Sequence, residues 1–136
     1  MDITRLQLFL RIFAIGPMSA VFAAMLPVEV MDRIHRAIGL GPMPSGPIVE
    51  YLARSTSMFY AIHGALLWYI ASDLRRYRDL FRFYLWISLL FAAGLFLTDL
   101  SAGLPLRWTL AEGPIVGAFV AVIMVWFGHV SRTSPG

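Results

Sequence analysis

The sequence predicts an all-α membrane protein, with four transmembrane helices in one bundle and a short interfacial helix between the first and second crossings. Hydrophobic residues make up 59% of the 136 residues and charged residues 14%, against about 45–50% and about 25% in soluble domains. Four apolar runs each approach the roughly 20 residues that a helix needs to cross a bilayer. None of them alternates as barrel strands do. We therefore expect a single membrane domain over residues 1–136.

The first crossing is expected over about residues 6–26. A cleaved signal peptide is the alternative, because small residues at positions 20–24 resemble a cleavage site. Arg11 interrupts the apolar region and the run exceeds the roughly 7–15 residues of a signal core, which favours a membrane helix. Gly16 and Pro17 predict a kink near its centre, since proline removes a backbone hydrogen bond. The long stem of Arg11 can reach the inner headgroups.

A short amphipathic helix is expected in the outer interface over about residues 28–39. Its apolar residues recur at helical spacing. Two i,i+4 ion pairs are expected on its polar face, Glu29 with Arg33 and Asp32 with Arg36. Glycines and prolines end the helix and form a stiff return segment, the strap, over residues 39–47.

The remaining crossings are expected over about residues 51–72, 80–100 and 109–130. All eleven basic residues are arginine, and their positions set the orientation. With a cytoplasmic N-terminus, seven lie inside and four outside, which the positive-inside rule favours. The inner set is Arg5, Arg11, Arg75, Arg76, Arg78, Arg82 and Arg132, and the outer set is Arg33, Arg36, Arg54 and Arg107. We expect a multi-pass protein of the bacterial inner membrane with both termini in the cytoplasm.

Composition and charge argue against several functions. The net charge is only +3, and the one arginine cluster, at positions 75–82, lies between two apolar runs. This pattern is typical of a cytoplasmic hairpin and not of a nucleic-acid-binding face. The chain has no cysteine, which excludes disulfides, thiol nucleophiles and cysteine-ligated metals. We expect no catalytic residue, no cofactor, no metal and no nucleic-acid partner.

Three ionisable residues inside the predicted crossings form the candidate site, which we call the outer-leaflet cluster: Arg54, Asp99 and Glu112. Each lies about one turn below the outer end of its helix, where a charge is costly and marks a functional lead. Asp99 shares a helix face with Ser88 and Ala92, and small residues mark faces where membrane helices approach closely. Arg54 likewise shares a face with Ser57, Ala61, Gly64 and Ala65. We expect Arg54 to pair with Asp99, Glu112 or both.

The outer-leaflet cluster has two interpretations. It is either a static clasp between helices or a site for a ligand or a proton. Two acids face one arginine, so either one carboxyl is protonated or Arg107 completes the set. Small-residue faces favour the clasp, and the unbalanced acids and the kinked first helix favour a site.

His63 is a secondary candidate near the middle of the second crossing. It lies nine residues from Arg54, about 900° around the helix, and therefore on its opposite side. We expect a neutral packing histidine near Tyr60, because the other histidines, His35 and His129, belong to different regions. On the last crossing Gly113, Gly117 and Ala121 form a small-residue stripe suited to packing within the bundle or between two copies.

The segment from Asp99 to Pro114 reads D-x3-G-x-P-x2-W-x3-E-G-P. Together with the spacing of Arg54, Tyr60 and Gly64, it resembles small, uncharacterised bacterial four-helix integral membrane proteins. The resemblance covers most of the chain. It implies the four-helix topology and an outer-leaflet polar motif, and it implies no chemistry, because no activity attaches to that group.

Three residues of this motif have expected local roles. Pro105 shapes a tight outer loop, and Trp108 anchors it at the interface. Glu112 is expected in the first turn of the last helix, where the helix dipole favours a carboxylate.

Two functional classes remain open. The first is a non-catalytic structural, accessory or self-associating bundle pinned by the outer-leaflet cluster, with membrane lipid and a second copy or a larger membrane complex as partners. The second is a binding protein or enzyme for an apolar or lipid-like molecule whose polar end the cluster holds. Transport is a weaker third, since the chain shows no inverted repeat.

Overall fold

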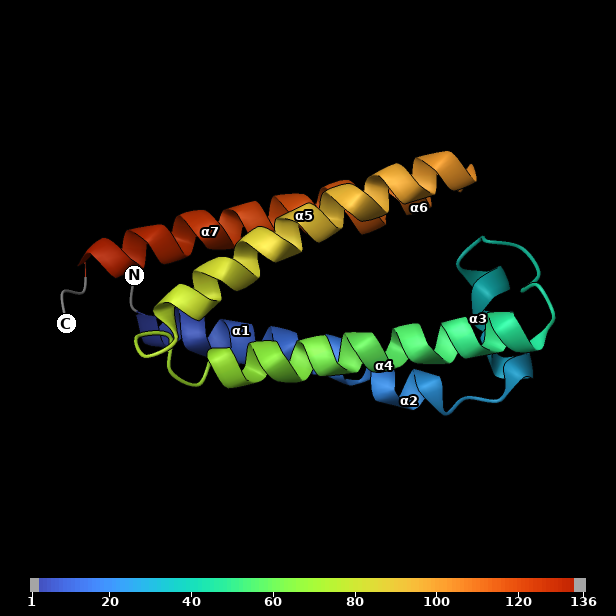
Figure 1. Cartoon of the computed structure of the whole chain (residues 1–136), viewed down its shortest axis with the longest axis horizontal. Coiled ribbons are helices and arrows are strands. Elements are labelled where there is room, and N and C mark those ends of the chain that lie inside the picture. Colours follow the sequence, from blue (N-terminus) through green and yellow to red (C-terminus); the bar gives the residue numbers. More distant parts are fainter. Residues whose placement is uncertain (1–2, 134–136) are drawn as a thin grey trace. The chain divides into compact units, whose positions relative to one another are not determined.

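The computed structural model describes residues 3–133, and the regular secondary structure of this part of the chain consists of helices, without strands (Figure 1). The elements in chain order are α1 (Ile3–Met18), α2 (Ala20–Ala24), α3 (Val28–Ala37), α4 (Pro47–Ile70), α5 (Arg78–Ala102), α6 (Leu106–Leu110), the π-helix η1 (Ala111–Ile115) and α7 (Val116–Thr133). They form two compact units. The first covers Phe9–Ser72, and the second covers the chain from Asp73 onward together with the start of α1 up to Leu8.

Among residues 3–133, three helical segments are long and apolar enough to cross a membrane: Ile3–Ala24, Arg78–Ala102 and Leu106–Arg132. By length and composition they are the helices of a membrane protein. The predicted crossing over 51–72 is the helix α4, whose 24 residues span about 36 Å. It is not among these three segments, and it carries Glu50, Arg54 and His63. Its role as a fourth crossing stays a prediction.

In the unit over Phe9–Ser72, α4 lies alongside α2 and crosses α1 closely. A Cβ atom on Gly64 would lie 2.6 Å from the Met18 backbone nitrogen and 2.9 Å from the Ala14 carbonyl oxygen. Only a glycine lets two helix backbones approach this closely. Gly64 of the small-residue face predicted on α4 thus packs against α1, whereas Ala65 of the same face is exposed.

The expected kink in the first crossing is a break between two helices. α1 ends at Met18, one residue after Pro17, and α2 begins at Ala20. Between them the Ser19 backbone N–H donates to the carbonyls of Ile15 at 2.9 Å and Gly16 at 3.1 Å. The Ser19 hydroxyl also donates to Gly16 at 2.6 Å. Local hydrogen bonding therefore satisfies the backbone where proline interrupts the helix.

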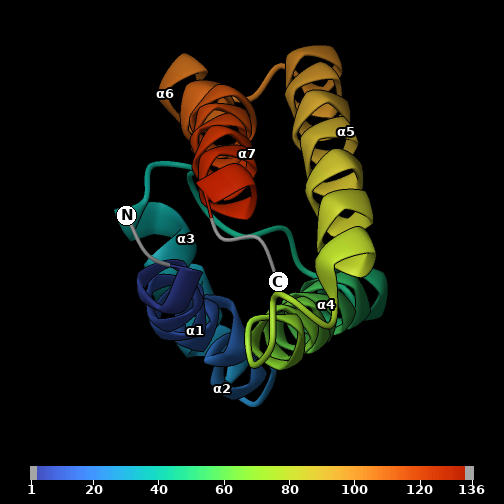
Figure 2. The same ribbon diagram turned by 90° about the vertical axis from the view of Figure 1, so that its left-hand side faces the viewer.

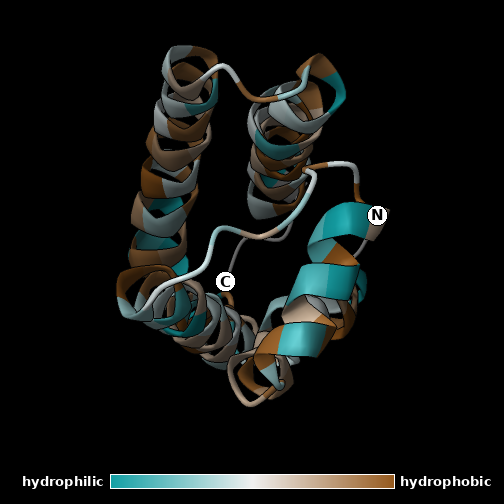
Figure 3. Ribbon diagram, turned by 90° about the vertical axis from the view of Figure 1, so that its right-hand side faces the viewer, coloured by the Kyte–Doolittle hydropathy of each residue, from teal (hydrophilic) through white to brown (hydrophobic). Residues whose placement is uncertain are grey.

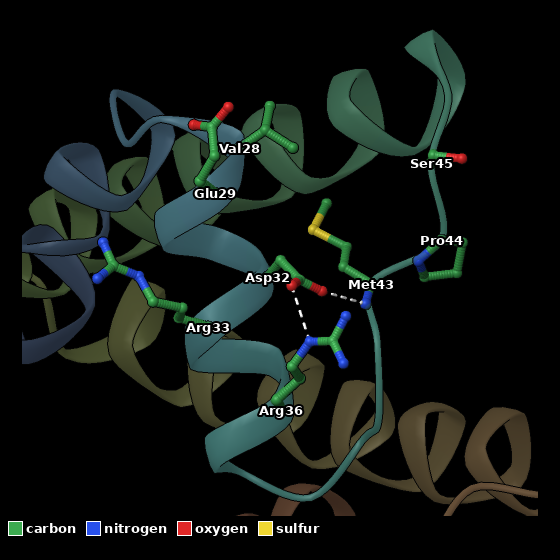
Figure 4. Close-up of a pocket in the computed structure, with 8 residues that line it drawn as sticks. All are labelled: Val28, Glu29, Asp32, Arg33, Arg36, Met43, Pro44 and Ser45. Carbon is green, nitrogen blue, oxygen red and sulfur yellow. Dashed lines mark hydrogen bonds and ion pairs between the residues drawn. The ribbon is translucent and has the colours of Figure 1, made fainter.

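The helix predicted over 28–39 is α3, and its polar character stands out in Figure 3, where it faces the viewer and is largely teal. It ends at Ala37, two residues before Gly39, whose φ is 85°. Of the two predicted ion pairs, Asp32 with Arg36 is confirmed at 2.8 Å. The pair of Glu29 with Arg33 was wrong, since these side chains point apart (Figure 4).

Side chains of α3 hold the strap. The Asp32 carboxylate accepts a hydrogen bond from the Met43 backbone N–H at 2.8 Å. The Nδ1 atom of His35 forms a hydrogen bond with the Gly41 carbonyl oxygen, also at 2.8 Å. The same Asp32 carboxylate accepts from Arg36 Nε. The Asp32 carboxylate thus binds both Arg36, on the polar face of α3, and the backbone of the strap.

Acidification is expected to release the strap from α3. The hydrogen bonds from Arg36 and from the Met43 backbone lower the pKa of Asp32, because both favour the charged carboxylate. The stabilisation that the ionised Asp32 carboxylate gives to the folded state is therefore complete above about pH 4, near the pKa of a free aspartate. It is lost as the pH falls through the lowered pKa of Asp32 in the folded state. Amide exchange in the strap, corrected for intrinsic rates, should accelerate on acidification in the wild type and show less pH dependence in Asp32→Asn. Equal pH dependence in both proteins would contradict the anchoring.

In the second unit, α5 packs against η1 and α7 (Figure 2). A Cβ on Gly113 would lie 2.6 Å from Phe96 Cβ, and one on Gly117 would lie 3.7 Å from Ala92 Cβ. The predicted small-residue stripe therefore packs within the chain at these two glycines, whereas Ala121 is exposed.

The last crossing begins earlier than predicted. Helical structure starts at Leu106, directly after Pro105, and continues through η1 into α7. The missing N–H of Pro114 falls inside this segment, and the chain takes a wider π-helical turn there. Glu112 thus lies within a continuous helical segment, and its predicted place in the first turn was wrong. α5 ends in a left-handed residue, Gly103, with φ 67°.

Candidate functional site

Arg54 is held by two backbone carbonyl groups at the end of α2. Its Nη1 donates to Ala24 O at 2.5 Å and its Nη2 donates to Leu26 O at 3.1 Å. The last carbonyls of a helix have no partner within the helix. Arg54 supplies that partner and so ties α4 to the end of α2.

These two hydrogen bonds use only two of the N–H groups of the Arg54 guanidinium. Arginine carries five N–H donors in a planar fork, and the carbonyls of Ala24 and Leu26 take one each from Nη1 and Nη2. Nε and the second hydrogen of each Nη can still donate. The same side chain can therefore hold the end of α2 and also pair with a carboxylate.

Asp99 is buried on α5, with 4% of its surface exposed. Its Oδ2 atom has no hydrogen-bond partner within residues 3–133. Ser88 and Ala92, which share its helix face, are also buried. Leaving a buried carboxylate oxygen without a partner is costly, so a hydrogen-bond donor to this atom would stabilise the protein.

Glu112 is half-buried in η1, in the same compact unit as Asp99. The π-helical turn around it is of the kind that occurs frequently at functional sites. Arg54 belongs to the other unit. Its pairing with Asp99 or Glu112 stays a prediction.

The secondary candidates fall at different places. His63 is exposed on α4, next to the buried Gly64, and Tyr60 is half-buried on the same helix. Arg107 is exposed in α6, and Trp108 beside it is half-buried. Within the described residues, no three His, Asp or Glu side chains come together as a metal-binding group.

A contact that the sequence analysis missed involves Arg11. Its Cζ atom lies 4.6 Å from the centre of the Trp68 ring, within the range of a cation–π interaction. This contact joins α1 to α4 at the end of α4 away from Arg54. The two arginines in the apolar parts of this unit both contact a neighbouring helix of the same chain.

A pocket of about 570 Å³ lies between α3 and the strap (Figure 4). Its lining residues are Val28, Glu29, Asp32, Arg33, Arg36, Met43, Pro44 and Ser45. No residue of the outer-leaflet cluster lines it. No sequence pattern predicted this pocket, because it forms only when the strap folds back against the helix.

No protein-family model, curated protein or solved structure matches this chain. The function is therefore inferred from contacts within the chain.

Proposed function

We propose that this protein is a non-catalytic integral membrane protein, an accessory or self-associating subunit whose intramembrane charges hold its helices together. The observation that supports this proposal most strongly is the double hydrogen bond from Arg54 to the end of α2. It gives the costly charge in α4 a role in the fold of the chain. The close approach at Gly64, on the same face of α4, supports the same role.

The outer-leaflet cluster extends this role in the proposal. In this proposal the donors left on Arg54 pair with Asp99, Glu112 or both. The unpartnered Oδ2 atom of Asp99 supports this pairing, because it is a buried acceptor that lacks a donor. Ion pairing lowers the cost of burying each charge alone.

The topology belongs to the same proposal. α4 is the fourth crossing, and α3 lies in the outer interface of a bacterial inner membrane with both termini in the cytoplasm. The length of α4, 24 residues, supports a crossing, since about 20 residues suffice. The arginine distribution supports the orientation.

Cysteine labelling tests the fourth crossing directly, because the chain has no cysteine of its own. Ser45 precedes α4 and Ser72 follows it, and both are exposed. In spheroplasts of a bacterial expression host, a membrane-impermeant maleimide should label Ser45→Cys at once. It should label Ser72→Cys only after permeabilisation. Labelling of both from the outside would mean that α4 does not cross.

A second function is favoured by one observation, the buried and unpartnered Oδ2 atom of Asp99. A lipid-like molecule with a hydroxyl or ammonium head could donate to it. Native mass spectrometry of protein purified in mild detergent separates the two functions. A second copy or a stoichiometric protein partner supports the subunit role. A small molecule held one per chain, and lost in Asp99→Asn, supports the binding role.

A further inference from the structure

The turn between α4 and α5 concentrates positive charge in a defined shape. We call residues 73–82 the arginine hairpin, after Arg75, Arg76, Arg78 and Arg82. The Asp73 carboxylate accepts the backbone N–H groups of Arg75 at 3.2 Å and Arg76 at 3.0 Å. The Tyr77 N–H donates to the Asp73 carbonyl at 3.0 Å. The turn is thus held by its own hydrogen bonds.

The four guanidinium groups are engaged to different degrees. Arg82 forms an ion pair with Asp79 at 3.3 Å, on a fully solvated surface where such pairs contribute little. Arg76 lies over the Tyr77 ring at 5.4 Å. Arg75 and Arg78 are exposed and make no side-chain hydrogen bond or ion pair within the described part of the chain. These two are available to an external anion.

The position of the hairpin identifies the anion. Arg78 is the first residue of α5, a helix long and apolar enough to cross a membrane. Residues at the end of such a helix lie at the depth of the phospholipid phosphates. The planar fork of arginine matches phosphate oxygens in a bidentate manner, and basic clusters beside membrane helices attract anionic lipids.

We propose that the arginine hairpin binds the headgroup of an anionic phospholipid, with Arg75 and Arg78 on its phosphate. This inference rests on the membrane crossing of α5 that the proposed function includes. It does not depend on the outer-leaflet cluster, on the crossing of α4 or on self-association. The lipid-binding inference can therefore fail while the subunit role stands, and the subunit role can fail while lipid binding stands.

The test is a titration of purified protein in neutral detergent, followed by native mass spectrometry. The probes are short-chain phosphatidylglycerol, phosphatidylcholine of the same chain length, and inorganic phosphate. The wild type should bind phosphatidylglycerol in preference to both others. Arg75→Gln/Arg78→Gln should weaken this binding about 30-fold. Each arginine near an anionic lipid surface contributes about 1 kcal/mol, and about 1.4 kcal/mol corresponds to a tenfold change in affinity.

Matched variants make the outcome specific. Arg33→Gln/Arg107→Gln removes the same charge from two exposed arginines outside the hairpin and should leave the affinity within about threefold, because screening confines such attraction to about one Debye length. Arg75→Lys/Arg78→Lys keeps the charge but lacks the planar fork, so its affinity should fall between those of the wild type and the glutamine variant. This variant also tests the inference if the glutamine variant fails to fold, because lysine binding as tight as that of the wild type would contradict bidentate contact. Wild-type binding by a folded glutamine variant overturns the inference. So does equal loss in the control, or phosphate binding as tight as that of the lipid.

Discussion

Replacing Arg54 by alanine is expected to lower the free energy of unfolding in mild detergent by about 2–4 kcal/mol. The substitution removes the hydrogen bonds to Ala24 O and Leu26 O, and each unsatisfied buried polar group costs about 1–3 kcal/mol. Arg54→Lys should fall between alanine and wild type, because an ammonium group lacks the fork that reaches both carbonyls. Unfolding followed by helical circular dichroism measures the loss.

The matched control is Arg33→Ala on α3. Arg33 is exposed and makes no hydrogen bond or ion pair within the described residues, so its loss should change stability by no more than about 0.5 kcal/mol. If the Arg54 and Arg33 variants are equally stable, the carbonyl contacts contribute nothing and the structural role of Arg54 is wrong.

Gly64→Ala is expected to destabilise the protein by about 1–3 kcal/mol, the usual cost of overpacking. The added methyl group would lie 2.6 Å from the Met18 nitrogen and 2.9 Å from the Ala14 oxygen. Both are backbone atoms, so α1 or α4 must move to admit it. The same unfolding measurement applies, and a loss of the Arg11 contact with Trp68 would show as a change in tryptophan fluorescence.

Gly94→Ala provides the control within a membrane-capable helix. Gly94 is exposed on α5, and a Cβ there meets nothing within 4 Å. Because alanine favours a helix by about 0.8–1.0 kcal/mol over glycine, this variant should be as stable as the wild type or more stable. A Gly64→Ala variant that matches it would contradict the close packing of α1 and α4.

The helices could be predicted because each apolar run is long and its ends carry local signals. Gly103 after α5 is such a signal, whereas α4 begins at Pro47, a residue that was expected in the strap. Glu112 was expected in the first turn of the last helix because Gly113 and Pro114 follow it, but helical structure already begins at Leu106. The chain absorbs that proline in a π-helical turn, a tertiary solution that no local pattern specifies.

The candidate site was predictable only in part. Burial of Asp99 follows from its place on a face of small residues. The partners of Arg54 could not be predicted from the charges of side chains. The atoms that bind it are backbone carbonyls, which every residue carries. The Asp32 contact with Met43 was likewise hidden, because it joins residues 11 positions apart through the fold of the strap.

The central claim is that the intramembrane charges hold the helices together, and a double-mutant cycle tests it most directly. The cycle combines Arg54→Gln with Asp99→Asn, and a second cycle combines Arg54→Gln with Glu112→Gln, each read as the free energy of unfolding in detergent. The claim predicts a coupling energy of about 0.5–3 kcal/mol in at least one cycle, as for residues in contact. Additivity within about 0.3 kcal/mol in both cycles would mean that Arg54 pairs with neither carboxylate and would contradict the claim.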